Sequence, residues 1–134
     1  AEFTHTKAYA PNKALQSAGF DRLEFTDGHN IITLNINKRW ELGEFNTYSL
    51  VGLGIAIPHV DALPSGGLHT FEYQYSGPAV RGAVGLSRKL NDKFSIFTEY
   101  QFTASDNKVS LRNGGTLNTK LLTNAINAGM SYHF

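Results

Sequence analysis

The C-terminal stretch NAINAGMSYHF alternates with a period of two. Its outward set, read from the end of the chain, is Phe134, Tyr132, Met130, Ala128 and Ile126, all apolar or aromatic, and the residues between them are small or polar. A period of two places successive side chains on opposite faces of a β-strand. This stretch therefore predicts a strand with one apolar face and one polar face.

The same alternation recurs along the chain and predicts β-strands at residues 2–9, 30–40, 47–60, 71–90 and 94–105, and a terminal strand that ends at Phe134. Helical spacing is almost absent, and only NKALQSAG could form a helical turn. The turns ELGEFN and NDK are short, whereas the other connections are long. In bacterial outer-membrane barrels, short turns face the periplasm and long loops face outside. The pattern therefore predicts an all-β, antiparallel up-and-down transmembrane β-barrel, in one domain over residues 1–134.

Alternation alone does not say which face points outward, so a soluble lipid-binding barrel is the rival of a membrane barrel. The polar face favours the membrane barrel, because it carries Gly, Ala, Ser, Thr and Asn with few charges, unlike a water-facing surface. Aromatic residues near predicted strand ends fit the girdles found at membrane interfaces: Trp40, Phe94, Tyr132 and Phe134. The net charge of +1 gives no reason to expect a nucleic-acid partner.

Arg81 and Glu99 are the charges expected well inside the barrel. Buried charges need partners, so we predict a desolvated pair or network that fills the interior. Single-chain bacterial barrels have an even number of strands, from about eight upward. A barrel of six would leave almost no interior, and an open sheet would leave unpaired edges in lipid. We therefore expect eight strands, with one hairpin missing from the N-terminal side of this sequence.

Several stretches together resemble one family: EFTHTKAYA, GFDRLEFTDGHNIITLN, GLGIAIPHV, FEYQYSGPA, FSIFTEYQF and NGGTLNTKLLTNAINAGMSYHF. They are similar to the alphaproteobacterial outer-membrane β-barrels known as lipid A oxidases, over nearly the whole chain. The resemblance implies a bacterial outer-membrane location and two more strands before residue 2. It also implies dioxygen-dependent oxidation of the proximal glucosamine of lipid A to 2-aminogluconate. The terminal Phe134 resembles the signal read by the barrel-assembly machinery.

Polar residues gather at the predicted outer rim, where the saccharide of lipid A would lie. The candidates for acid–base catalysis are Asp27, His29, His59 and Glu72. The candidates for a metal site are His29, His59 and Asp61. Dioxygen chemistry usually needs a metal or an organic cofactor, and these ligands suit a divalent metal such as iron. The alternative is that all of them are ordinary rim residues in water.

The sequence leaves two functions from different classes open. One is a lipid A oxidase, and the other is a non-catalytic barrel with a structural, adhesive or assembly-subunit role, including a role in a larger complex. Lipopolysaccharide and outer-membrane lipids are the expected partners in both. A lipid A deacylase is not expected, because Ser131 and His133 lie at the opposite rim from the lipid A head.

Overall fold

The computed structural model describes the backbone of residues 1–134 and the side chains of all of them except Tyr9, Thr26 and Asp27. The elements are β1 (Glu2–Tyr9), α1 (Asn12–Ala18), β2 (Phe20–Leu42), β3 (Phe45–Pro64), β4 (Thr70–Tyr73), β5 (Gly77–Lys89), β6 (Phe94–Ser110) and β7 (Thr116–Tyr132). The prediction of an all-β chain is confirmed, and the helical turn predicted at NKALQSAG forms as α1. Within the described residues, no helix is long and apolar enough to cross a membrane.

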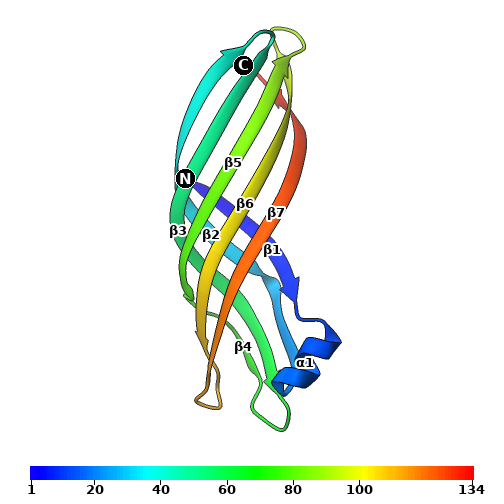
Figure 1. Cartoon of the computed structure of the whole chain (residues 1–134), viewed down its shortest axis with the longest axis vertical. Coiled ribbons are helices and arrows are strands. Elements are labelled where there is room, and N and C mark those ends of the chain that lie inside the picture. The colour runs from blue at the N-terminus through cyan, green and yellow to red at the C-terminus, as the bar shows by residue number, and fades with distance from the viewer.

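All strands belong to one antiparallel sheet with the order β1-β2-β3-β5-β6-β7, and β4 pairs with β3. The tight β2–β3 and β5–β6 turns lie at the same end of the sheet as the C-terminus (Figure 1). We call this the short-turn end. The opposite end, which we call the loop end, carries α1, β4 and the β6–β7 connection. The two short turns thus lie together at one end, as the sequence pattern predicts, whereas the β6–β7 connection at the other end, residues 111–115, is shorter than predicted.

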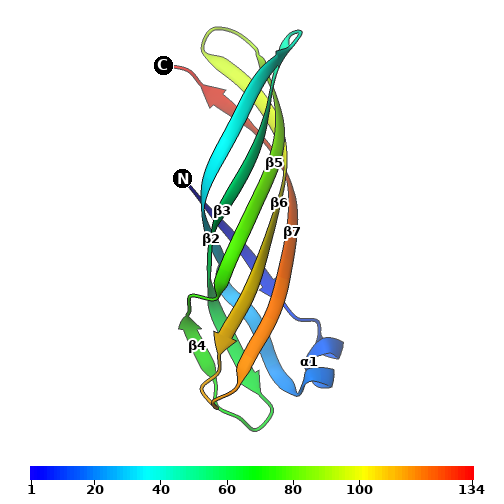
Figure 2. The ribbon, with the colours of Figure 1, turned by 60° about the vertical axis from the view of Figure 1, so that its left-hand side comes forward.

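The sheet twists steeply along its length and curls, so that one side is concave (Figure 2). Side chains from strands far apart in the sheet meet on this concave side. His29 of β2, for example, lies 3.1 Å from Asn107 of β6. The strands β1 and β7 form the two edges of the sheet.

The predicted strand over residues 71–90 is wrong, because the structure divides it into β4 and β5. β4 pairs with residues 59–62 of β3, whereas β5 pairs with residues 45–56. At the break, Gln74 N–H donates to the Pro58 carbonyl (3.1 Å) and Ser76 N–H to the Ala56 carbonyl (3.0 Å). Gly77 follows with a φ of 152°, a value that residues other than glycine rarely adopt.

β2 also differs from its prediction, because it begins at Phe20 rather than near residue 30. The pairing with β3 shifts between Phe25 and His29, where Gly28 has a φ of 102°. The irregular backbone at Gly28 is therefore accommodated inside a long strand. β6 likewise extends beyond its predicted end at residue 105 to Ser110, and β7 begins at Thr116.

The apolar residues of the alternation point to the convex side of the sheet and are exposed. Leu34 is 75% exposed, Ile36 78% and Ile126 81%. The residues of opposite parity point to the concave side, where Arg81 and Thr103 are buried. We call the exposed convex residues the apolar belt: Ile32, Leu34, Ile36, Val51, Leu53, Ile55, Val80, Val84, Ile96, Tyr100, Phe102, Leu122, Ile126 and Met130.

Candidate functional site

The concave side is filled with apolar side chains at the loop end. Its buried core there consists of Phe25, Val60, Ala62, Val109 and Leu111. The half-buried Leu117 and Leu121 of β7 pack against this core, as does Ala8 of β1. Because both edge strands reach the same core, the curl of the sheet is tight.

A buried polar cluster, made of His29, Ser76, Ser105 and Asn107, lies next to this core. The ring of His29 stacks on Phe25 with a centroid distance of 5.6 Å. Its Nε2 lies 3.1 Å from Asn107 Oδ1 and 2.9 Å from Ser105 Oγ. The Asn107 oxygen also accepts a hydrogen bond from Ser76 Oγ (2.7 Å), and the Asn107 amide donates to Ser105 Oγ (2.9 Å). The cluster therefore links β2, β6 and the β4–β5 connection.

His29 is the chemically distinctive member of the polar cluster. Burial lowers the pKa of His29, and the hydrogen bond to Asn107 opposes that effect. With the Asn107 oxygen as acceptor, Nε2 carries the hydrogen of the neutral ring, and Nδ1 keeps a lone pair. That Nδ1 is buried and has no hydrogen-bond partner among the side chains that the structure describes. A neutral imidazole with a free lone pair can accept a proton or bind a ligand.

The polar cluster lies beyond the loop-end limit of the apolar belt. Asp106 and Lys120 form a facing pair at the level of Ser105 and Asn107, and both are exposed. Charged convex residues at this level contrast with Leu122, the next convex residue of β7 toward the short-turn end. Along the strands, the polar cluster is thus level with charged convex residues and not with the apolar belt.

His59 does not join His29. Pro58 is the residue directly opposite His29 in the β2–β3 pairing, so the adjacent His59 points to the other face of the sheet. There it packs against the rings of Phe71 and Tyr73, at centroid distances of 4.4 and 4.5 Å. The structure therefore does not bring together the metal set predicted from His29, His59 and Asp61.

Asp61 and Glu72 have other partners. The buried carboxylate of Asp61 accepts hydrogen bonds from His69 Nε2 (2.7 Å) and Arg22 Nη1 (3.3 Å). The exposed Glu72 accepts one from the side chain of Gln74 (3.0 Å). The side chain of Asp27 lies outside the described residues, so its predicted role beside His29 stays a prediction. Among the described side chains, no group of three or more His, Asp or Glu could hold a metal ion.

The predicted interior ion pair is present. Arg81, 3% exposed, places Nη2 3.2 Å from Glu99 Oε1 and 2.8 Å from Glu2 Oε1. Tyr48 donates a short hydrogen bond of 2.6 Å to the other Glu99 oxygen. Glu2 and Tyr48 were not predicted as members, although the inward parity of Glu2 beside the outward Phe3 is visible in the sequence. The buried guanidinium of Arg81 therefore pairs with carboxylates from both β1 and β6.

The concave side also opens into a cavity of about 590 Å³ at the short-turn end, with Arg39, Lys89 and His133 in its lining. His133 Nε2 lies 2.8 Å from Ser95 Oγ. His133 is thus a polar group at the short-turn end, as expected, and is far along the sheet from the polar cluster at the loop end.

No family model, curated protein or solved structure matches this chain. The resemblance to lipid A oxidases therefore stays a prediction.

Proposed function

We propose that this chain is the membrane-spanning sheet of a bacterial outer-membrane β-barrel. The observation that carries the proposal is the apolar belt on the convex side. Soluble proteins rarely expose contiguous apolar patches larger than a few hundred Å². Lipid, in contrast, is the natural environment for an outward-facing apolar band. A soluble lipid-binding barrel would need the opposite arrangement, with the apolar parity inside.

Aromatic residues flank the belt at both ends. At the short-turn end, Tyr132 contacts the rings of Phe94 and Phe134, at centroid distances of 5.2 and 5.1 Å. At the loop end, Phe71 and Tyr73 are about half exposed. Such rings are stable between headgroups and hydrocarbon, so this placement supports two interfacial girdles.

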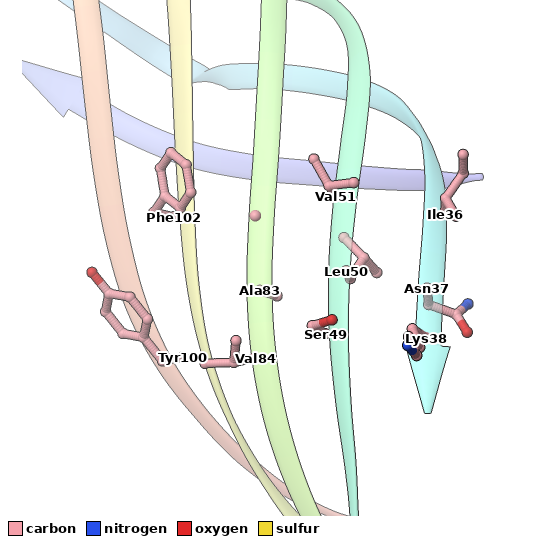
Figure 3. Close-up of a pocket in the computed structure, with 11 residues that line it drawn as sticks. Ile36, Asn37, Lys38, Ser49, Leu50, Val51, Ala83, Val84, Tyr100 and Phe102 are labelled. Carbon is pink, nitrogen blue, oxygen red and sulfur yellow. The ribbon is translucent and has the colours of Figure 1, made fainter. Parts of the chain in front are cut away.

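The belt is also hollowed in a way that suits lipid. Val51, Val84, Tyr100 and Phe102 line a shallow depression of about 560 Å³ that crosses four strands (Figure 3). Gly82 also lines this depression. The ring of Phe102 occupies the space that a side chain at position 82 would need. An apolar depression on an exposed face supports contact with flexible acyl chains rather than with water.

The membrane proposal is tested with Trp40, which is the only tryptophan and is 45% exposed near the short-turn end. The chain is refolded in the presence of phospholipid vesicles, with and without lipids brominated along their acyl chains. We expect the brominated lipids to quench the Trp40 fluorescence. A chain that stays monomeric in buffer without detergent, with unquenched Trp40, contradicts the proposal.

A second candidate function is the oxidation of lipid A at the loop end, and the geometry of His29 favours it. A buried neutral imidazole, whose Nδ1 has no partner among the described side chains, lies at the height where the saccharide of an outer-leaflet lipid would be. We propose that His29 accepts a proton there. The described residues hold no preformed metal site, so the oxidising cofactor is not assigned.

The activity is tested by expression in a bacterial host without it, followed by mass spectrometry of the extracted lipid A. A gain of one oxygen on the proximal sugar supports oxidation, and His29→Gln should abolish it while the protein still reaches the outer membrane. His133→Gln, at the opposite end, is the matched control and should retain the activity. Unaltered lipid A despite correct insertion would favour the non-catalytic barrel, with a structural, adhesive or assembly role.

A further inference from the structure

The cavity at the short-turn end has a lining whose charges are all positive. Its basic residues are Arg39, Lys89 and His133, and none of the described residues that line it is acidic. Neither Arg39 nor Lys89 forms an ion pair with a residue that the structure describes. The cavity therefore presents two cationic side chains to whatever enters it, without a carboxylate in the lining to neutralise them.

Hydroxyl groups next to Lys89 add hydrogen-bond donors. Lys89 faces Ser95 in the β5–β6 pairing, and Ser95 faces Ser131 in the β6–β7 pairing. All three line the cavity, and His133 Nε2 lies 2.8 Å from Ser95 Oγ. Ammonium and hydroxyl groups donate hydrogen bonds to carboxylate and phosphate oxygens. This row across three adjacent strands is thus suited to hold an anionic group.

The lining becomes apolar further from the short-turn end. Phe97 lies two residues beyond Ser95 on β6, and Leu50 lies four residues beyond Asn46 on β3. The ring of Phe97 occupies the space that a side chain at Gly129 would need, so it lies over β7 on the concave side. A molecule that enters from the short-turn end thus meets cations and hydroxyls first and apolar side chains behind them.

The Arg81 network borders the cavity through Tyr48. Tyr48 lines the cavity and donates its hydroxyl hydrogen to Glu99 (2.6 Å). Glu99 itself does not line the cavity and is paired with Arg81 at 3.2 Å. The carboxylate behind Tyr48 is therefore held by a different cation and is not the counter-ion of Arg39.

We propose that this cavity binds a single-chain amphiphile whose anionic head is a carboxylate or a phosphate monoester. The head is held by Arg39, Lys89 and Ser95, and the chain packs against Leu50 and Phe97. The volume of about 590 Å³ lies in the range of small-molecule sites, which are mostly apolar with a few polar groups that orient the ligand. Because the site is on the concave side, the inference goes beyond the proposed function and does not depend on what covers the apolar belt.

The probe for the test is decanoate that carries a photoreactive diazirine at the far end of its chain. It is added to the chain refolded as for the Trp40 measurement, and peptide mass spectrometry after irradiation identifies the labelled residues. Labelling at increasing probe concentration gives an apparent Kd. Decyl phosphate with the same diazirine tests the second head, decanol with the same diazirine has the tail without the charge, and inorganic phosphate as competitor has the charge without the tail.

We expect saturable labelling of Leu50 and Phe97 by decanoate or decyl phosphate, and the tighter of the two identifies the head. Replacing Arg39 and Lys89 together by glutamine should raise the Kd about tenfold, because two exposed ion pairs are lost. Lys38→Gln combined with Arg88→Gln is the matched control. These residues precede Arg39 and Lys89 in the chain, point to the opposite face and change the net charge equally, so the wild-type Kd should be retained.

Four results would overturn the inference. Labelling confined to belt residues would mean that no amphiphile enters the concave side. Equal Kd values for decanol and the anionic probes would mean that the cations do not recognise the head. Displacement by inorganic phosphate at the concentration of the probe would mean that the site binds an anion and not an amphiphile. An equal Kd in the two double variants would mean that Arg39 and Lys89 have no specific role; all four replaced side chains are exposed, so both variants should fold.

Discussion

Replacing Ile126 by lysine tests most directly whether the apolar belt faces lipid or water. Ile126 is 81% exposed and points outward from the middle of the belt portion of β7. If the belt faced water, Ile126→Lys would change the free energy of unfolding by no more than about 0.5 kcal/mol. A lysine that faces lipid near the bilayer midplane instead destabilises a barrel by about 2–4 kcal/mol.

The expected loss can be stated as a shift in a denaturation midpoint. A change of about 2 kcal/mol lowers the folding constant by a factor of roughly 30. With a urea dependence of about 2 kcal/mol per molar, the midpoint falls by about 1 M. The assay is urea unfolding in lipid vesicles, followed by the fluorescence of Trp40.

Asn118→Lys is the matched control. Asn118 is also exposed and outward on β7, but it lies beyond the belt at the loop end. A lysine near the interface is expected to destabilise the protein by about 0–1 kcal/mol. An Ile126→Lys protein with the wild-type midpoint, or with the same loss as Asn118→Lys, would refute the argument that lipid covers the belt.

The remaining predictions concern the interior and the chain end. Arg81→Met leaves the partly exposed carboxylates of Glu2 and Glu99 without their buried cation and should lower the unfolding free energy by about 1–3 kcal/mol in the same urea assay; a wild-type midpoint would show that the network does not contribute to stability. Gly54→Ala places a methyl group against the Ile32 carbonyl of the neighbouring strand, so the yield of folded protein after refolding should fall, and an unchanged yield would contradict this close approach. Because the pKa of His29 is lowered by folding, the unfolded chain binds a proton below about pH 6.5 before the folded one does, and stability falls as the pH drops from there toward the folded pKa. His29→Gln should reduce that loss between pH 7.5 and 5.5 in urea titrations, and an equal loss in both proteins would argue against a depressed pKa. Deletion of Phe134 should reduce the fraction of protein found in the outer membrane of expressing cells, while refolding in vitro is unchanged; equal amounts in cells would mean that Phe134 is not part of an assembly signal.

The period of two was sufficient to predict the antiparallel all-β fold and the inward position of Arg81 and Glu99, because side-chain parity in a strand is a local property. The break between β4 and β5 also had a local signal that the prediction of one strand overlooked. Outward parity changes from odd at Phe71 and Tyr73 to even at Pro78 and Val80. Alternation that changes phase at a Gly-Pro pair indicates two strands, and not one.

The polar cluster could not be predicted in the same way. His29 lies 76 residues from Ser105 in the sequence and 78 from Asn107, and nothing local says that the sheet curls enough to join them. The predicted metal set failed for a related reason. His29 and His59 lie at the same end of adjacent strands, but Pro58 is the residue opposite His29, so the adjacent His59 points to the other face of the sheet. Proximity along two strands does not determine whether two side chains share a face.

The filling of the interior bears on which barrel functions are reasonable. The apolar core at the loop end, the polar cluster next to it and the Arg81 network further along occupy successive levels of the concave side. Large barrels that conduct solutes keep a water-filled, polar lumen instead. Buried apolar residues such as Val60 and Val109, each 0% exposed, would obstruct such a path at the loop end. The loop end of the described interior is therefore not suited to conduct solutes, and the buried His29 Nδ1 beside the apolar core has no hydrogen-bond partner among the described side chains.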